Sequence, residues 1–155
     1  MFQRYRFEAE TDPDLSFIPL YVRMKLDLVG IKLALKTWLA FTMEERELLC
    51  RLPAESEAEK KLYADYLDAL SERATAAKAV RAEPAGGLEW RADGSVPEAV
   101  AARSRAAGAA VTDLEWTGWG RFQRYALLKL ALSRNDPDRF ARALKEFRER
   151  DGEKT

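Results

Sequence analysis

The sequence predicts an all-α fold: a single-domain, irregular bundle of about five to seven helices with a short extended N-terminal arm. Apolar residues recur at spacings of three and four along most of the chain, which is the period of an amphipathic helix. Ser or Thr followed three residues later by Glu, a signature of helix starts, occurs repeatedly. The 155 residues, 47% of them hydrophobic, suit one domain with a core, which we place over residues 1–155.

The N-terminal half is predicted to contain the arm and four helices. Residues 5–10 alternate apolar and charged side chains, which favours an extended segment. The first helix should begin near Pro19 and stop at Gly30, because proline suits a first helical turn and glycine the position after a last one. Capping pairs mark the starts of two later helices. The further helices are expected over residues 33–41, 42–52 (Thr42 with Glu45) and 56 to about 79 (Ser56 with Glu59).

The C-terminal half is predicted to open with a less ordered region, residues 82–113. Proline and three glycines break any period over residues 82–95, which therefore read as a loop. A capping pair, Ser95 with Glu98, should open an Ala-rich segment with few large apolar residues, which we expect to be peripheral. Two helices follow. The first covers residues 120–132, and the second starts with Asp136 as N-cap and Pro137 at its first position.

Charge balance argues against a dedicated nucleic-acid binder. The chain has 26 basic and 26 acidic residues and a formal net charge of zero, whereas phosphate neutralisation favours a strongly basic domain. The charges are unevenly spread: residues 42–72 carry a net charge of −5 and residues 121–155 a net charge of +4. The basic C-terminal third therefore leaves nucleic-acid binding as an alternative.

Histidine and cysteine usage excludes several reaction classes. The chain has no histidine, so Ser-His-Asp and Cys-His catalytic sets and imidazole-based zinc or haem sites cannot form. Cys50 is the one cysteine, which rules out an internal disulfide. Clusters of glutamate at residues 44–47 and 55–59 fit helix starts better than a metal site. We therefore expect a protein that is not an enzyme and has no catalytic residues, metal or other cofactor.

The chain also lacks the features of a membrane or exported protein. No stretch reaches the roughly 18 apolar residues of a membrane helix. The first residues lack the apolar core of a signal peptide. We expect a soluble cytoplasmic protein with no membrane contact. Homo-oligomerisation remains open.

Residues 120–132, GRFQRYALLKLAL, could be a nucleic-acid surface or one helix of the core. Its aromatic and leucine side chains share one broad helical face, which favours core packing. Lys129 lies on that face between Phe122 and Tyr125. It is either a lysine that extends to solvent or pairs with a carboxylate such as Asp27, which we favour, or an amine of depressed pKa that acts in catalysis.

The first predicted helix has a narrow polar strip between its apolar sides, and the charged residues in this strip are again either structural or functional. Arg23 and Asp27 occupy it four residues apart, as a structural ion pair or as part of a partner-facing site. Three tryptophans in or beside segments read as irregular, Trp90, Trp116 and Trp119, are either interface anchors or, as we favour, packed on the domain itself.

Two blocks of the sequence resemble the small nitrate reductase-associated proteins and together cover about half the chain. The family motifs are an F-E segment, I-P-x-x-V-R-x-K-L-D, G-I-K-L-x-L-x-x-W, an E-E-R-x-x-L helix, R-F-A-L-x-K-L-S-R and a closing A-L-x-E-F. The matching residues are Phe7-Glu8, Ile18-Pro19, Val22-Arg23, Lys25-Leu26-Asp27, Gly30-Ile31-Lys32-Leu33, Leu35, Trp38, Glu44-Glu45-Arg46, Arg124, Lys129 and Glu146-Phe147.

The resemblance implies an accessory role. Such proteins are linked to bacterial assimilatory nitrate reductase and support its maturation or activity without reducing nitrate themselves. Nitrate reductase is therefore the expected partner, bound through protein–protein contact. A helical interaction module with another partner is the alternative, besides nucleic-acid binding. The residues that we expect to contact a partner are Arg23, Asp27, Trp38, Trp119, Arg124 and Lys129.

Overall fold

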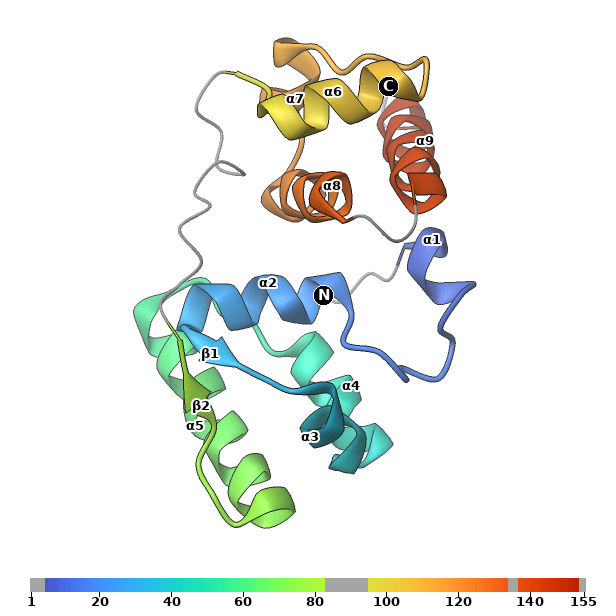
Figure 1. Cartoon of the computed structure of the whole chain (residues 1–155). Coiled ribbons are helices and arrows are strands. Elements are labelled where there is room, and N and C mark those ends of the chain that lie inside the picture. Colours follow the sequence, from blue (N-terminus) through green and yellow to red (C-terminus); the bar gives the residue numbers. More distant parts are fainter. Residues whose placement is uncertain (1–4, 83–94, 134–136, 154–155) are drawn as a thin grey trace. The chain divides into compact units, whose positions relative to one another are not determined.

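The structure is a computed structural model that describes residues 5–82, 95–133 and 137–153, with side chains described up to residue 150. Most of these residues lie in helices, which confirms the all-α prediction (Figure 1). The elements in chain order are α1 (Arg6–Ala9), α2 (Leu20–Val29), β1 (Ile31–Lys32), α3 (Leu35–Ala40), α4 (Met43–Arg51), α5 (Glu57–Thr75), β2 (Val80–Arg81), α6 (Glu98–Ala106), α7 (Asp113–Gly118), α8 (Arg121–Leu132) and α9 (Pro137–Glu153).

The described residues form two compact units. The N-terminal unit holds residues 11–82, and the C-terminal unit holds residues 95–153 together with Tyr5–Glu10. The described residues therefore begin in the C-terminal unit at Tyr5, continue through the N-terminal unit and then return. That the chain forms a single domain stays a prediction.

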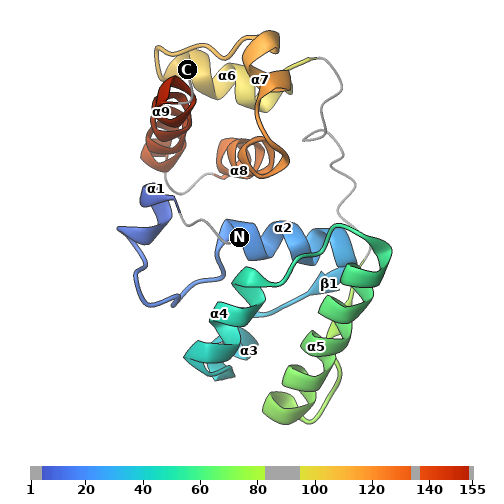
Figure 2. The same cartoon turned by 180° about the vertical axis from the view of Figure 1, so that it is seen from behind.

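In the N-terminal unit, α2 contacts both α4 and α5, as Figure 2 shows. Its bounds match the prediction: Pro19 is the N-cap, and Gly30 ends the helix in the left-handed region at φ 73°. Both predicted capping boxes form, at Thr42 and at Ser56. The core gathers the inward faces of these helices. Its members include Val22, Leu26, Trp38, Phe41, Leu49, Tyr63 and Leu67.

The prediction that the helix from residue 56 continues to about 79 was wrong. The helix α5 ends at Thr75, and Ala76 takes a left-handed conformation with φ 64°. The chain then reverses into β2, which pairs antiparallel with β1 so that Ile31 faces Arg81. This two-residue pairing was not predicted, because strands this short leave no alternation to detect.

In the C-terminal unit, α8 packs against α6 and α9 (Figure 1). Most of its aromatic and leucine face is buried, with Tyr125, Leu127 and Leu130 each at most 4% exposed, whereas Phe122 is half-buried and Leu132 is exposed. Core packing was thus the right interpretation of residues 120–132. From α9, Phe140, Leu144 and Phe147 complete this core.

The N-terminal arm is not extended. Residues 6–9 form one helical turn, α1, packed on α9. The alternation of apolar and charged side chains also fits one helical turn, and the contacts with α9 favour the turn over a strand that has no neighbouring strand to pair with.

Three further expectations for the C-terminal half need correction. The Ser95–Glu98 capping box does not form, because α6 starts at Glu98 and its N-cap is Pro97, which makes no side-chain cap bond. The Ala-rich segment is less peripheral than expected, since Val100 and Ser104 are fully buried. Residues around Trp116, read as irregular, form α7, which a capping box of Thr112 and Glu115 opens. The predicted loop at 82–95 and the Asp136 N-cap lie almost wholly outside the described residues.

Candidate functional site

Three of the six residues expected to contact a partner lie in the N-terminal unit. Arg23 has an exposed side chain on α2, and its Nε donates to the Ile18 carbonyl at 3.1 Å. Asp27 is half-buried one turn further along α2. Trp38 is fully buried on α3, where its Nε1 donates to the Leu15 carbonyl at 2.8 Å. Of these three, Arg23 presents the most accessible side chain.

The other three lie in the C-terminal unit. Trp119 is 3% exposed and lies just after α7. Arg124 is buried on α8, and its guanidinium donates to the Trp119 carbonyl. Lys129, half-buried on α8, places its Nζ 5.5 Å from the centre of the Tyr125 ring, a cation–π distance. Trp119 and Arg124 are therefore held in the fold.

Burial also decides whether the other tryptophans are interface anchors or are packed on the chain itself. Trp116 is fully buried within α7, so it cannot anchor a partner in this conformation. Packing on the chain itself, the interpretation that we favoured, is right for Trp116 and Trp119. Trp90 lies outside the described residues.

Sequence reasoning missed a buried lysine at the centre of the N-terminal unit. Lys25 is 2% exposed, and its Nζ donates to the carbonyls of Leu49, Cys50 and Leu52 at 2.6, 2.9 and 2.7 Å. These carbonyls belong to the last turn of α4 and the residue after it, which lack partners within the helix. The ammonium group thus caps the negative end of α4.

The surroundings of Lys25 lower its pKa. Burial, which disfavours the charged form, brings the pKa down from 10.5 to about 8. The rings of Tyr21 and Tyr63 lie 4.6 and 5.0 Å from the Nζ, and the Tyr63 hydroxyl donates to the Leu49 carbonyl. The sequence did contain a signal: Lys25 stands between Met24 and Leu26 on a helix with apolar residues on two sides. A lowered lysine pKa suits a catalytic amine, but this amine is enclosed and bonded to backbone.

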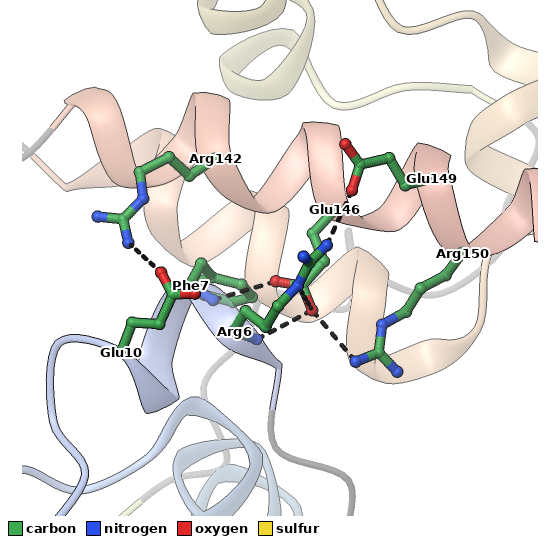
Figure 3. Close-up of polar contacts among 7 residues, drawn as sticks. All are labelled: Arg6, Phe7, Glu10, Arg142, Glu146, Glu149 and Arg150. Atoms are coloured by element: carbon green, nitrogen blue, oxygen red, sulfur yellow. Dashed lines mark hydrogen bonds and ion pairs between the residues drawn. The ribbon is translucent and has the colours of Figure 1, made fainter.

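A second polar cluster joins α1 to α9 in the C-terminal unit (Figure 3). Glu146, 4% exposed, accepts from the backbone N–H groups of Arg6 at 2.9 Å and Phe7 at 3.0 Å. The guanidinium of Arg150 lies 3.3 Å from the same carboxylate. We call these residues, with Glu10, Arg142 and Glu149, the α1–α9 cluster. Its centre is a carboxylate that holds the first turn of α1 in place.

The rim of the α1–α9 cluster is made of exposed ion pairs. Arg6 bonds Glu149 at 2.8 Å, and Arg142 lies 3.6 Å from Glu10. Exposed pairs of this kind contribute little to stability, so a partner's charges can replace them at small cost. Beneath the rim, the rings of Phe7 and Phe147 meet edge to face at 5.8 Å.

The basic residues of α9 are mostly neutralised by nearby carboxylates. Arg139, Arg142, Arg148 and Arg150 each have a glutamate oxygen within 4.0 Å. Arg148 makes the tightest pair, with both its Nε and Nη2 bonding Glu115 at 2.9 Å. Such pairs compete with phosphate contacts, which weakens the nucleic-acid alternative.

Within the described ranges, no group of three or more Cys, Asp and Glu side chains is placed to hold a metal ion. None of the helices in these ranges has the length and apolar character that crossing a membrane requires.

A model of one protein family matches the chain over residues 4–147, and its description is "conserved nitrate reductase-associated protein". The chain belongs to this family. No curated protein and no solved structure matches it.

The geometry explains several motif residues of the nitrate reductase-associated family as parts of the scaffold. The Phe7-Glu8 and Glu146-Phe147 motifs, at opposite ends of the chain, meet in the α1–α9 cluster. Lys25 caps α4. Arg46 donates to the carbonyls of Trp38 and Leu39 at 3.1 and 2.9 Å. These motifs therefore identify a fold more directly than a reactive site.

Proposed function

We propose that the chain is a non-enzymatic accessory protein of assimilatory nitrate reductase, which supports the maturation or activity of the reductase through protein–protein contact. The observation that carries this proposal is the family match over residues 4–147. The family description names an association with nitrate reductase and no reaction.

The residue inventory supports a role other than catalysis. The chain has no histidine and one cysteine, which removes the commonest acid–base and nucleophilic sets. The strongly perturbed amine, Lys25, is enclosed among backbone carbonyls. A catalytic amine must reach its substrate, and this one faces the end of α4.

Arg23 is the best candidate for direct contact among the six residues expected to bind a partner. Its guanidinium is exposed on α2, and exposed arginines are frequent anchors of interfaces. The buried residues Trp38, Trp119 and Arg124 would act by holding the surface in shape. Asp27 and Lys129, both half-buried, lie at intermediate depth.

The test is capture of partners by the tagged full-length chain in its native host, grown with nitrate as nitrogen source and read by mass spectrometry. Arg23→Ala is compared with Lys32→Ala, a matched change at another exposed cation of the same unit. Circular dichroism establishes that both variants remain folded. The wild type and Lys32→Ala should recover nitrate reductase in equal amounts. Arg23→Ala should recover less of it.

Each result has a definite meaning. Absence of the reductase from the wild-type sample, with other proteins recovered, would contradict the accessory role. Equal recovery by both variants would leave the role in place and remove Arg23 from the contact surface.

A further inference from the structure

The C-terminal unit contains an apolar cleft beside α9 that neither the core nor the α1–α9 cluster fills. We call it the α9 cleft. It has a volume of about 530 Å³, within the range of small-molecule sites. Its lining is mainly apolar, from the turn after α6 and from α9. The residues are Ala107, Ala109, Ala141, Leu144, Lys145, Arg148 and Glu149.

Small side chains create this space, and hydrogen bonds keep its wall in place. Gly108 takes a left-handed conformation with φ 71° between the two alanines of the turn. The N–H of Ala109 donates to the Ser104 carbonyl at 2.9 Å. Arg148 bonds both Glu115 and the carbonyl of Ala110, the latter at 3.1 Å. The cleft is therefore formed before any ligand arrives.

A polar hollow of about 180 Å³ adjoins the cleft, since Lys145 and Glu149 line both. The hollow lies over the α1–α9 cluster, whose carboxylates and guanidiniums Figure 3 shows. An apolar space and a charged space with a common wall suit a ligand that has both characters in one molecule.

The charges of the lining residues determine which sign of charge the polar group of a ligand should carry. Most ionic side chains that line the two spaces are paired: Arg6 with Glu149, Arg142 with Glu10, Glu146 with Arg150, and Arg148 with Glu115. Lys145 is exposed and has no ion pair with any residue in the part of the chain that the structure describes. The wall between cleft and hollow thus carries one uncompensated positive charge.

We propose that the α9 cleft binds a small amphiphilic anion, with the apolar chain against Ala109, Ala141 and Leu144 and the anionic group at Lys145. The ligand class is an aliphatic monocarboxylate or a compound of the same shape and charge. This site is independent of the proposed partner role, because none of its lining residues is among the six expected to contact the reductase.

The experiment is calorimetric titration of the full-length chain with decanoate below its micelle concentration. Two variants test the two halves of the site. Ala141→Leu fills the apolar space from the exposed side of α9, and Lys145→Gln removes the charge while keeping the stem. The matched controls are Ala69→Leu on α5 and Lys36→Gln on α3, both exposed helical positions of the other unit.

Decanoate should bind one site per chain. Ala141→Leu should weaken binding about tenfold or more and Lys145→Gln about fivefold, and the controls should behave as wild type. Decyltrimethylammonium, which has the same chain and the opposite charge, should bind more weakly than decanoate. Absence of saturable decanoate binding, equal affinity in all variants, or equal binding of the two probes would overturn the proposal.

Discussion

Polar side chains of this protein stabilise the fold largely by binding backbone groups. Lys25 binds three carbonyls near the end of α4, Arg46 those of Trp38 and Leu39, and Glu146 two amides of α1. Buried backbone groups without partners are costly, so each of these side chains satisfies a need that the helices leave open. Removing one of these side chains should therefore lower the free energy of unfolding by more than removing an ordinary surface side chain would.

Replacement of Lys25 by methionine should destabilise the chain by about 2–4 kcal/mol, because the carbonyls of Cys50 and Leu52 lose a charged donor in a buried place. Urea unfolding followed by circular dichroism measures the loss. Lys36→Met, at an exposed position of α3, is the control and should change stability by at most about 0.5 kcal/mol. Equal effects of the two changes would contradict the capping role.

The lowered pKa of Lys25 should make stability depend on alkaline pH. The folded pKa is about 8 and the ordinary value 10.5, so between them the unfolded chain binds more protons than the folded one. The free energy of unfolding therefore rises with pH in this window, and the contribution is constant below it. From pH 8 to about 9.5, the stability of the wild type relative to Lys25→Met should grow by about 1–2 kcal/mol. If urea unfolding showed the same stability difference between the wild type and Lys25→Met at every pH in this range, the lowered pKa of Lys25 would be contradicted.

Among the helix ends, the sequence predicts some correctly and misses others. The capping boxes of α4 and α5 are local, and both were predicted correctly. The end of α5 was not, because Ala76 adopts a left-handed conformation that alanine does not signal. A non-glycine residue with positive φ is strained, and here the return of the chain into β2 imposes it.

The same substitution should have opposite effects inside α5 and at the residue that follows it. Ala76→Gly relieves the left-handed strain and should stabilise the chain by about 0.5–1 kcal/mol. Ala69→Gly, exposed in the helix interior, should destabilise it by about 1 kcal/mol. Thermal unfolding of both variants measures the two signs. Destabilisation by Ala76→Gly would show that residue 76 is not left-handed in solution.

The single turn of α1 depends on the α1–α9 cluster, since a helix this short is not stable alone. Glu146→Ala removes two charge-assisted hydrogen bonds that the first amides of α1 donate to this carboxylate, and each is worth about 1.5–3 kcal/mol. Amide hydrogen exchange over residues 5–10 should accelerate about tenfold or more. Glu149→Ala, which loses an exposed pair with Arg6, is the control and should change exchange little. Unchanged exchange in Glu146→Ala would contradict the holding role of Glu146.

At the scale of the whole molecule, charge is balanced in total and largely paired on the basic α9. The formal net charge is zero, and four arginines of α9 have glutamate partners. Phosphate binding would have to break these pairs.

The chain should therefore bind duplex DNA no more strongly than a neutral protein. Fluorescence anisotropy of labelled DNA should show no saturable binding up to about 10 μM protein at physiological salt. Tight binding that weakens steeply with added salt would instead support the nucleic-acid alternative.

The sequence by itself determined the helical class, most helix starts, the catalytic sets that cannot form and the family motifs. Those features rest on signals within a few residues: periodicity, capping pairs and composition. Tertiary structure decided which polar residues are buried, the helical form of residues 6–9 and the meeting of Phe7 with Glu146, 139 residues apart. Lys25 shows the physical reason, because its burial depends on carbonyls at least 24 residues away that need a donor. No local pattern records a partner that distant.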